Sequence, residues 1–506
     1  MRTSRPLVVT VCAVLLATVS HSVRATTYTW QGGGGTIDWS DAGNWAGGTP
    51  PLSDLQTTDL IFGNAGARVS SRIAPSFLFA PFSIRGLTFT SDASIYTFSG
   101  GPLRIGSGGI THNALNEQTF NAQILLGLDQ TWRLGSNAGA LRMSGNVDLA
   151  GRTLTIDAAR TGGSGNILDG NFAGSGGLIK TGAGTLTLGS FGSTFTGGTT
   201  VREGVLAFSS NGAFGSGGVT LAGGELRANV TATLGRTVTI GAGKTGTISA
   251  ATGTNLTLQG LALYGDLALG SAGNTGTITL GMTSFDGSDP TGTLSINAGR
   301  VRVGTTVVPG FIQNLERTTI AAGATFDLNN FSVGIHDLRG AGSLVLGSIG
   351  RPGPDGVEGS TPTLALYSGN FSGTISGYGG LVKESNGLLI LSGANTFSEG
   401  TTLYAGTLGI GHNSALGTAA LQVRGAATLY ADGGDRVLSQ RVFLNSDEAL
   451  TIGDGAGQQH RLTLAGPITG NGGLIKNGAG TLALTSNDNN FSGGLTLNGG
   501  TLAVAS

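Results

Sequence analysis

The sequence predicts an all-β fold, a parallel β-helix in which short strands stack coil upon coil. The apolar runs span about five or six residues and alternate apolar with polar side chains, as strands do. Glycine or a small polar residue ends most runs, and 93 of the 506 residues are glycine, against roughly 7% in ordinary proteins. A stretch of about 35 residues also occurs three times, and a sandwich or a barrel has no reason to show such a long-period repeat.

The repeated stretch is the unit around which the chain is organised. Its three copies fill residues 174–208, 377–410 and 470–504. The copies carry the same residue types at matched positions: Lys180, Lys383 and Lys476, then Phe195, Phe397 and Phe491. With roughly 20 to 25 residues in each coil, the chain after residue 25 is long enough for on the order of 20 coils.

Alternation within the repeat separates an inward from an outward set of side chains. Leu186 and Leu188 alternate with Thr185 and Thr187, and the leucines are predicted to fill the core. The last copy has the same pattern, with Leu482 and Leu484 inward and Thr481 and Ala483 outward. Outward threonines suit a solvated β surface, because the branched carbon favours strand geometry while the hydroxyl contacts water.

The composition describes a folded chain of low charge. Hydrophobic residues make up 39% and charged residues 11%, which is too apolar for a disordered chain. The formal charge is -1. Without the first 25 residues, 24 basic residues stand against 28 acidic ones. This balance argues against a nucleic acid or an anionic membrane as the partner.

Residues 1–25 read as a secretory signal peptide. Arg2 and Arg5 precede an apolar run at 7–19, and Val23 and Ala25 form a small-residue cleavage pattern, so the mature chain is predicted to begin at Thr26. A membrane anchor is the weaker interpretation, because the run is shorter than the roughly 18 to 20 residues that span a bilayer. No integral membrane segment is expected in the mature chain.

Cysteine chemistry is not expected after export. The single cysteine, Cys12, lies inside the apolar run of the signal peptide. The mature chain therefore offers neither a disulfide nor a cysteine-ligated metal.

Residues 26–56 are rich in tryptophan and are predicted to form an N-terminal cap. Trp30, Trp39 and Trp45 lie here, three of the four tryptophans of the chain. A cap covers the first open coil of a solenoid; an aromatic platform for sugars is the alternative. The β-helix itself is predicted over residues 57–506, with a proline- and glycine-rich loop at 350–362 as an insertion at a coil corner.

Catalytic chemistry has little support in the sequence. A β-helix enzyme acting on polysaccharide needs two or three converging carboxylates. The acidic clusters are Asp286 to Asp289, which could bind calcium, and the pair Asp432 and Asp435. Turns explain both better, because Asp-Gly and Asp-Pro are turn formers. No catalytic, cofactor-binding or metal-binding residue is therefore assigned, and no cofactor is expected.

The histidines give no sign of a zinc site. All five occur singly, and each is predicted to be an exposed corner residue: His21, His112, His336, His412 and His460.

The repeat resembles a known family at these residues. The pattern GGLIKTGAGTLTL followed by STFTGGTTVREGVL, with its two companions, is similar to the autotransporter-associated β-strand repeat, also called the passenger-associated transport repeat. The resemblance implies right-handed β-helices, exported by bacteria and either displayed on or released from the outer membrane, with the repeat helping secretion. It implies no single ligand.

The expected function is therefore a secreted or cell-surface protein of a Gram-negative-type bacterium, structural or adhesive, and not an enzyme. Its partners would be surface glycans or neighbouring cells. A polysaccharide-degrading β-helix enzyme is the alternative.

The end of the sequence departs from the complete autotransporter pattern. Nothing after Val504 resembles a translocator barrel, so we expect either a longer reading frame or separate help at the outer membrane. The last apolar strand, within residues 495–506, is expected to continue into further coils or to associate end-on with another chain.

Overall fold

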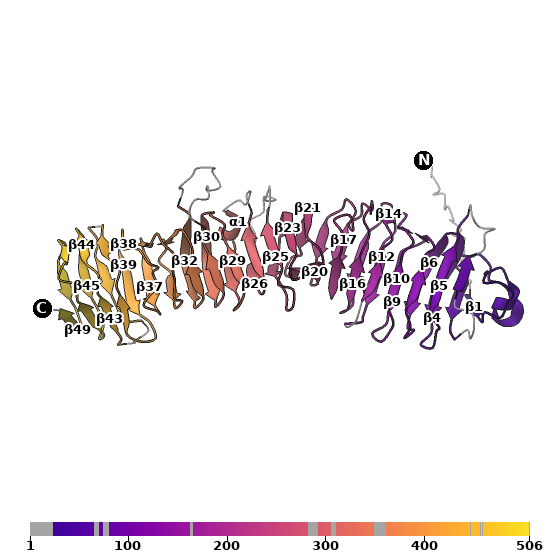
Figure 1. Ribbon diagram of the computed structural model, residues 1–506, viewed down its shortest axis with the longest axis horizontal. Helices are drawn as coiled ribbons and strands as arrows, with labels where there is room; N and C mark the ends of the chain where they lie inside the picture. Colours follow the sequence, from indigo (N-terminus) through magenta and orange to yellow (C-terminus); the bar gives the residue numbers. More distant parts are fainter. Residues whose placement is uncertain are drawn as a thin grey trace, which may run out of the picture.

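The computed structural model is an elongated parallel β-solenoid of about 18 turns, and the chain runs from one end of the rod to the other (Figure 1). The number of turns is close to the approximately 20 coils expected from repeat length. Crossover connections between parallel strands are almost always right-handed. This rule favours a right-handed solenoid, which the family resemblance also implies. The structure describes residues 24–64, 70–73, 80–161, 165–281, 292–304, 310–348, 361–445, 447–455, 457 and 459–504.

Each turn passes through three faces, which we number in chain order, and every strand pairs in parallel with its counterpart one turn away. The first face contains β1 (Thr26–Trp30), β2 (Thr58–Phe62), β9 (Gln130–Leu134), β12 (Leu154–Ala158), β15 (Leu178–Thr181), β17 (Thr199–Val201), β19 (Val219–Leu221), β34 (Gly380–Lys383), β36 (Thr401–Leu403), β38 (Leu421–Val423), β41 (Val442–Leu444), β44 (Ile468–Gly470) and β47 (Asn490–Phe491).

The second face is the most continuous and extends along nearly the whole rod. It contains β3 (Ser70–Ile73), β5 (Tyr96–Gly100), β7 (Gln118–Phe120), β10 (Leu141–Met143), β13 (Asn166–Leu168), β16 (Thr185–Leu188), β18 (Val205–Phe208), β20 (Glu225–Ala228), β22 (Thr245–Ala250), β24 (Asp266–Leu269), β26 (Thr293–Ile296), β28 (Arg317–Ile320), β35 (Leu388–Leu391), β37 (Gly406–Ile410), β39 (Ala427–Ala431), β42 (Leu450–Ile452), β45 (Leu474–Lys476) and β48 (Leu495–Leu497).

The third face closes each turn. It contains β8 (Ile124–Leu126), β11 (Val147–Asp148), β14 (Phe172–Ala173), β25 (Thr277–Leu280), β27 (Arg300–Val303), β29 (Thr325–Asp327), β31 (Ser343–Val345), β33 (Thr374–Ser376), β40 (Arg436–Leu438), β43 (Arg461–Leu464), β46 (Thr481–Leu484) and β49 (Thr501–Val504).

Six longer strands turn a corner and belong to two faces each. They are β4 (Phe82–Phe89), β6 (Leu103–His112), β21 (Ala232–Ile240), β23 (Asn255–Leu263), β30 (Val333–Gly340) and β32 (Thr363–Phe371).

The core is a ladder of apolar side chains stacked turn on turn. Leu186 lies in register with Leu206, which in turn pairs with Leu226, and all three are fully buried. Thr185 and Thr187 are only half-buried, so the predicted inward and outward sets of the first repeat are confirmed. This arrangement follows from the period of two along a strand combined with exact parallel pairing between turns.

The last repeat shows one departure from the predicted alternation. Leu482 and Leu484 are buried as expected, but Ala483 is also buried, although it was predicted to face outward into solvent. Ala483 lies in register between Thr463 and Ala503. The two neighbouring strands cover the single methyl group of Ala483 from both sides, so this residue is buried in spite of its outward parity.

Helix is nearly absent from the described residues, as predicted. It consists of α1 (Gly310–Gln313) and two 3-10 turns, η1 (Ala42–Asn44) and η2 (Ala46–Gly48). Within the described part of the chain, no helix is long and apolar enough to cross a membrane.

The tryptophans of the N-terminal segment are buried and packed on one another. The Trp45 ring meets the Trp30 ring edge-on at 5.2 Å and the Trp39 ring edge-on at 6.2 Å, and Phe62 packs beneath them. All three tryptophans are about 1% exposed. Buried rings present no face to a sugar, which argues against the aromatic platform. The role of residues 26–56 as a cap stays a prediction.

The three repeats do not occupy the same faces. In the first two copies the lysine strands, β15 and β34, lie on the first face. In the third copy the lysine strand β45 pairs through β42 with β39 and therefore lies on the second face. The third repeat is rotated by one face, since the repeat fixes two adjacent strands and a corner but not their position around the axis.

Three sequence predictions fall on residues that the structure does not describe. The signal peptide lies outside the described residues except for its last two positions, as does the proposed calcium segment, Asp286 to Asp289. Most of the loop at 350–362 also lies outside them, between β31 and β32. In the final turn, Leu497 and Val504 are largely exposed, and end-on association there stays a prediction.

Candidate binding groove on the third face

A polar groove of about 480 Å³ lies on the outer surface of the third face, across the strands from β23 to β31. Its floor is made by outward side chains in register: Thr279 pairs with Arg302, Arg302 with Asp327, and Asp327 with Val345. The inward neighbours Val301 and Val303 are fully buried. The alternation in β27 thus fixes both arginines of that strand, Arg300 and Arg302, on the solvent side.

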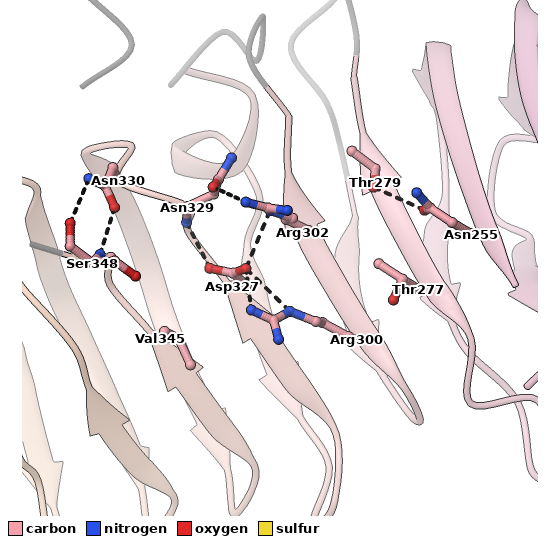
Figure 2. Close-up of a pocket in the computed structure, with 11 residues that line it drawn as sticks. Asn255, Thr277, Thr279, Arg300, Arg302, Asp327, Asn329, Asn330, Val345 and Ser348 are labelled. Carbon is pink, nitrogen blue, oxygen red and sulfur yellow. Dashed lines mark hydrogen bonds and ion pairs between the residues drawn. The ribbon is translucent and has the colours of Figure 1, made fainter. Parts of the chain in front are cut away.

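Asp327 joins the two arginines at the centre of the groove, between them in Figure 2. Its Oδ2 accepts hydrogen bonds from Arg300 Nη2 at 2.6 Å and Nε at 3.2 Å, and lies 3.5 Å from Arg302 Nε. The carboxylate is only 5% exposed, whereas the arginines are 50% and 36% exposed. A buried carboxylate needs such partners, so Asp327 positions the guanidinium groups while their outer edges stay in water.

Two asparagines form the turn at one end of the groove. Asn329 and Asn330 have left-handed backbones with φ of 51° and 70°, a conformation that asparagine tolerates better than most residues. The turn is held because the Asn329 backbone N–H donates to Asp327 Oδ1 at 2.9 Å and the Ser348 N–H donates to Asn330 Oδ1 at 2.8 Å. Strained backbone of this kind clusters at functional sites.

A second arginine pair around one aspartate lies on the second face, at Arg317, Asp337 and Arg339. Asp337 Oδ2 accepts hydrogen bonds from Arg317 Nε at 2.8 Å and Arg339 Nε at 2.9 Å. Burial raises the pKa of Asp337, but the hydrogen bonds and charges of the two arginines outweigh it and hold that pKa below its ordinary value. The arginines are about half exposed. Like the groove, this cluster combines two guanidinium groups with one carboxylate.

Asp432 and Asp435, the aspartate pair of the sequence analysis, both accept hydrogen bonds within the fold. Asp435 Oδ1 accepts a hydrogen bond from the Arg461 backbone N–H at 2.8 Å, which ties one turn to the next. The Asp432 backbone carbonyl accepts from Arg436 Nη2 at 2.7 Å. These contacts match the turn interpretation of both residues. Among the described residues no group of three or more His, Cys, Asp or Glu could hold a metal ion.

The prediction of exposed histidines is wrong for His112. Its ring is fully buried against Phe89, with ring centroids 5.6 Å apart, and Nε2 lies 3.0 Å from the Gly139 carbonyl. His112 has the same inward parity as Ile110 in β6, which places its ring in the core. His336 is exposed, while His412 and His460 are half-buried; His21 lies outside the described residues.

The lysines of the three repeats are buried, which the sequence analysis did not predict. Lys180, Lys383 and Lys476 are at most 1% exposed. Each ammonium group donates to the equivalent corner carbonyl of its own copy: Gly182 for Lys180, Ser385 for Lys383 and Gly478 for Lys476. Lys180 also donates to Thr181 at 2.7 Å and to Glu203, on the next turn, at 3.2 Å. The lysine therefore fastens the corner that follows its strand.

The comparisons with known proteins agree with this structural unit. The passenger-associated-transport-repeat model matches residues 178–208, 381–410 and 474–504. The chain thus carries three such repeats, as the resemblance at these positions indicated. No solved structure matches the chain.

A curated relative is also similar to part of the chain. Over 158 residues the chain is 34% identical to the adhesin BmaC autotransporter of Brucella suis biovar 1 (strain 1330). The match covers 29% of this chain and 5% of that protein, so the chain spans only a small part of that relative's length.

Proposed function

We propose that this chain is a cell-surface, passenger-type protein of a Gram-negative bacterium with an adhesive role. The observation that carries the proposal is the presence of three passenger-associated transport repeats within one continuous parallel β-solenoid. The partial similarity to an adhesin autotransporter supports the adhesive part. A rod of this kind holds its flanks away from the cell, where many weak contacts sum to strong attachment.

The outer surface of the rod suits binding to polar surfaces. Outward positions carry threonine, serine and asparagine, and the groove on the third face adds two half-exposed arginines around one carboxylate. Surface glycans and the surfaces of neighbouring cells present complementary hydroxyl and carboxylate groups. We therefore place the partner in this class.

The groove favours binding over cleavage, the alternative function. Glycoside hydrolysis uses a pair of carboxylates facing each other across the bond to be broken. The described lining residues of the groove include a single carboxylate, Asp327, and both arginines hold it. A single carboxylate cannot supply the pair of groups that this reaction uses.

The repeat assists export in this proposal by folding locally. Each turn of a solenoid contacts only its neighbours, so folding propagates turn by turn. A buried lysine that holds the corner of a turn stabilises that turn once it has folded. Replacing the three corner lysines with methionine is expected to lower the amount of the chain on intact cells more than its total amount in the cell, measured by surface labelling against whole-cell immunoblot.

The adhesive role is tested with beads that carry the exported chain. Beads coated at equal density with this chain, or with an unrelated β-solenoid as control, are applied to cell layers and to immobilised glycans under flow. Selective attachment of the first beads is expected. Equal attachment of both kinds would contradict adhesion, and release of new reducing ends from the glycans would favour the enzyme instead.

A further inference from the structure

The arginines of the groove have donors directed at solvent. Each guanidinium carries five N–H groups in a planar fork. Contacts with Asp327 and Asn329 engage Nε and Nη2, and within the described residues no hydrogen bond engages Nη1 of either arginine. Arg302 Nε is buried, so a ligand can reach this side chain only through its terminal nitrogens. The pair therefore presents the planar donor arrangement that binds a carboxylate through two parallel hydrogen bonds.

The charge balance limits how acidic the ligand can be. Asp327 cancels one of the two guanidinium charges, so the cluster has one positive charge in excess. A polysaccharide with one carboxylate on each sugar unit matches this single positive charge better than a densely sulfated one does. The carboxylate Oδ2 of Asp327 is shared by both arginines, so it orders the fork before the ligand arrives.

Uncharged polar groups flank the arginines on the side of β23 and β25. The Thr279 hydroxyl donates to Asn255 Oδ1 at 3.2 Å. Within the described residues, the Thr277 hydroxyl and the Asn255 amide nitrogen have no hydrogen-bond partner. Thr277 lies on the strand next to the arginines, and Asn255 lies one strand further from them (Figure 2). Such groups can donate to and accept from hydroxyls, as sugar sites require.

The groove follows the axis of the rod. Its lining crosses five successive strands of the third face, from Asn255 on β23 to Val345 on β31. With neighbouring strands about 4.8 Å apart, these span about 19 Å. A linear polymer can therefore lie along the groove with several of its units in contact.

From these observations we infer that the groove binds an acidic polysaccharide whose sugar units bear carboxylates. Arg300 and Arg302 take the carboxylate of one unit, while Thr277 and Asn255 take hydroxyls of the adjacent unit. This site rests on the proposed adhesive function and gives it a ligand class.

The test measures binding of defined oligosaccharides to the full exported chain. Fluorescent hexagalacturonate is the carboxylate probe, maltohexaose the neutral probe and a heparin hexasaccharide the sulfated probe. Binding of hexagalacturonate in preference to the other two is expected. The double variant R300Q/R302Q should weaken it by about tenfold or more for each arginine.

The matched control removes the same charges from the other cluster. R317Q/R339Q, on the second face, should leave the affinity unchanged. Because R300Q/R302Q leaves Asp327 without its arginine partners, a second variant leaves both arginines in place. V345E adds a carboxylate to the floor of the groove, and V345Q is its neutral control. V345E should weaken hexagalacturonate binding and V345Q should not.

Several results would overturn the inference. These are equal losses in R300Q/R302Q and R317Q/R339Q, tighter binding of the sulfated or neutral probe, or equal affinities of V345E and V345Q. The bead assay keeps the two claims separate, because beads that attach while hexagalacturonate fails to bind would refute the groove and leave the adhesive role standing.

Discussion

Replacing Lys180 with methionine tests whether the buried lysine fastens the corner of the repeat. Methionine keeps the length of the side chain but leaves the Thr181, Gly182 and Glu203 carbonyls without their donor. Losing a donor costs about 1–3 kcal/mol for each carbonyl, or roughly 6 kcal/mol for the three. The substitution also removes a buried charge, which offsets part of this loss.

The size of the offset follows from the pKa of the lysine. Burial lowers the pKa of Lys180 from 10.5 to about 8, against the opposing charges of Asp157 and Glu203. A shift of this size corresponds to roughly 3 kcal/mol. The net effect of Lys180→Met at pH 7 is therefore a local destabilisation of about 3 kcal/mol. Lys244 is exposed, and Lys244→Met should change stability by less than about 0.5 kcal/mol.

The pH dependence gives the prediction a second, independent readout. Between about pH 8 and 10.5 the unfolded chain keeps the Lys180 proton while the folded chain has lost it, so the stability of the parent rises with pH in this window. The methionine variant has no such group. The difference in stability between the parent and this variant should therefore grow between pH 7.5 and pH 9.5, below the ionisation of tyrosine.

Local opening is the quantity to measure, because a solenoid need not unfold as one unit. Val201 is buried and in register with Lys180 on the next turn, and the predicted mature chain has no cysteine of its own. In a Val201→Cys background, the rate of thiol labelling reports how often this turn opens. Equal rates for Lys180→Met and parent, or a deficit that shrinks as pH rises, would refute the role assigned to the lysine.

Three further predictions concern the core and the register of the turns. Leu186→Asp should destabilise its turn by several kcal/mol, because it buries an unpaired charge, and Thr187→Asp should have a mild effect; similar losses in chemical denaturation at both positions would show that the inward assignment is wrong. Burial lowers the pKa of His112, against the opposing effect of hydrogen bonds to the backbone of Gly139 and Ala140, so the unfolded chain gains a proton first as pH falls through about 6.5 and stability should drop there. The pH profile of His112→Gln should lack this drop, and an unchanged profile would contradict the burial of the ring. Thr187 and Ala207 lie side by side in register on adjacent turns, so cysteines at both positions should form a disulfide on mild oxidation. Mass spectrometry showing two free thiols would contradict the register.

Much of the fold could be predicted because parallel stacking obeys the same alternation in every turn. Leu186 and Thr187 could be placed inward and outward from their strand alone. The burial of Lys180 had a signal too, since it shares the parity of Leu178 in β15. Lysine is so seldom buried that this parity alone was not decisive. Only the corner carbonyls of the folded turn show why the ammonium group is stable there.

The groove could not be predicted because its parts come from separate turns. The pattern RVRV at β27 does place both arginines outward. Their partner Asp327 is a full turn further along the chain, and its position beside them depends on the lengths of the intervening corners. The rotation of the third repeat by one face has the same origin. Alternation gives the orientation of a side chain, whereas corner lengths decide which side chains become neighbours.

The proposed function requires that this solenoid is displayed on the cell surface and attaches the cell to other surfaces. The most direct measurement counts attached cells of the bacterium that makes the chain, with its gene intact, deleted or restored, while an antibody confirms display on intact cells. We predict a several-fold loss of attachment on deletion and recovery when the gene is restored. Equal attachment of all three strains, with the chain displayed in the first and third, would show that the chain is not an adhesin.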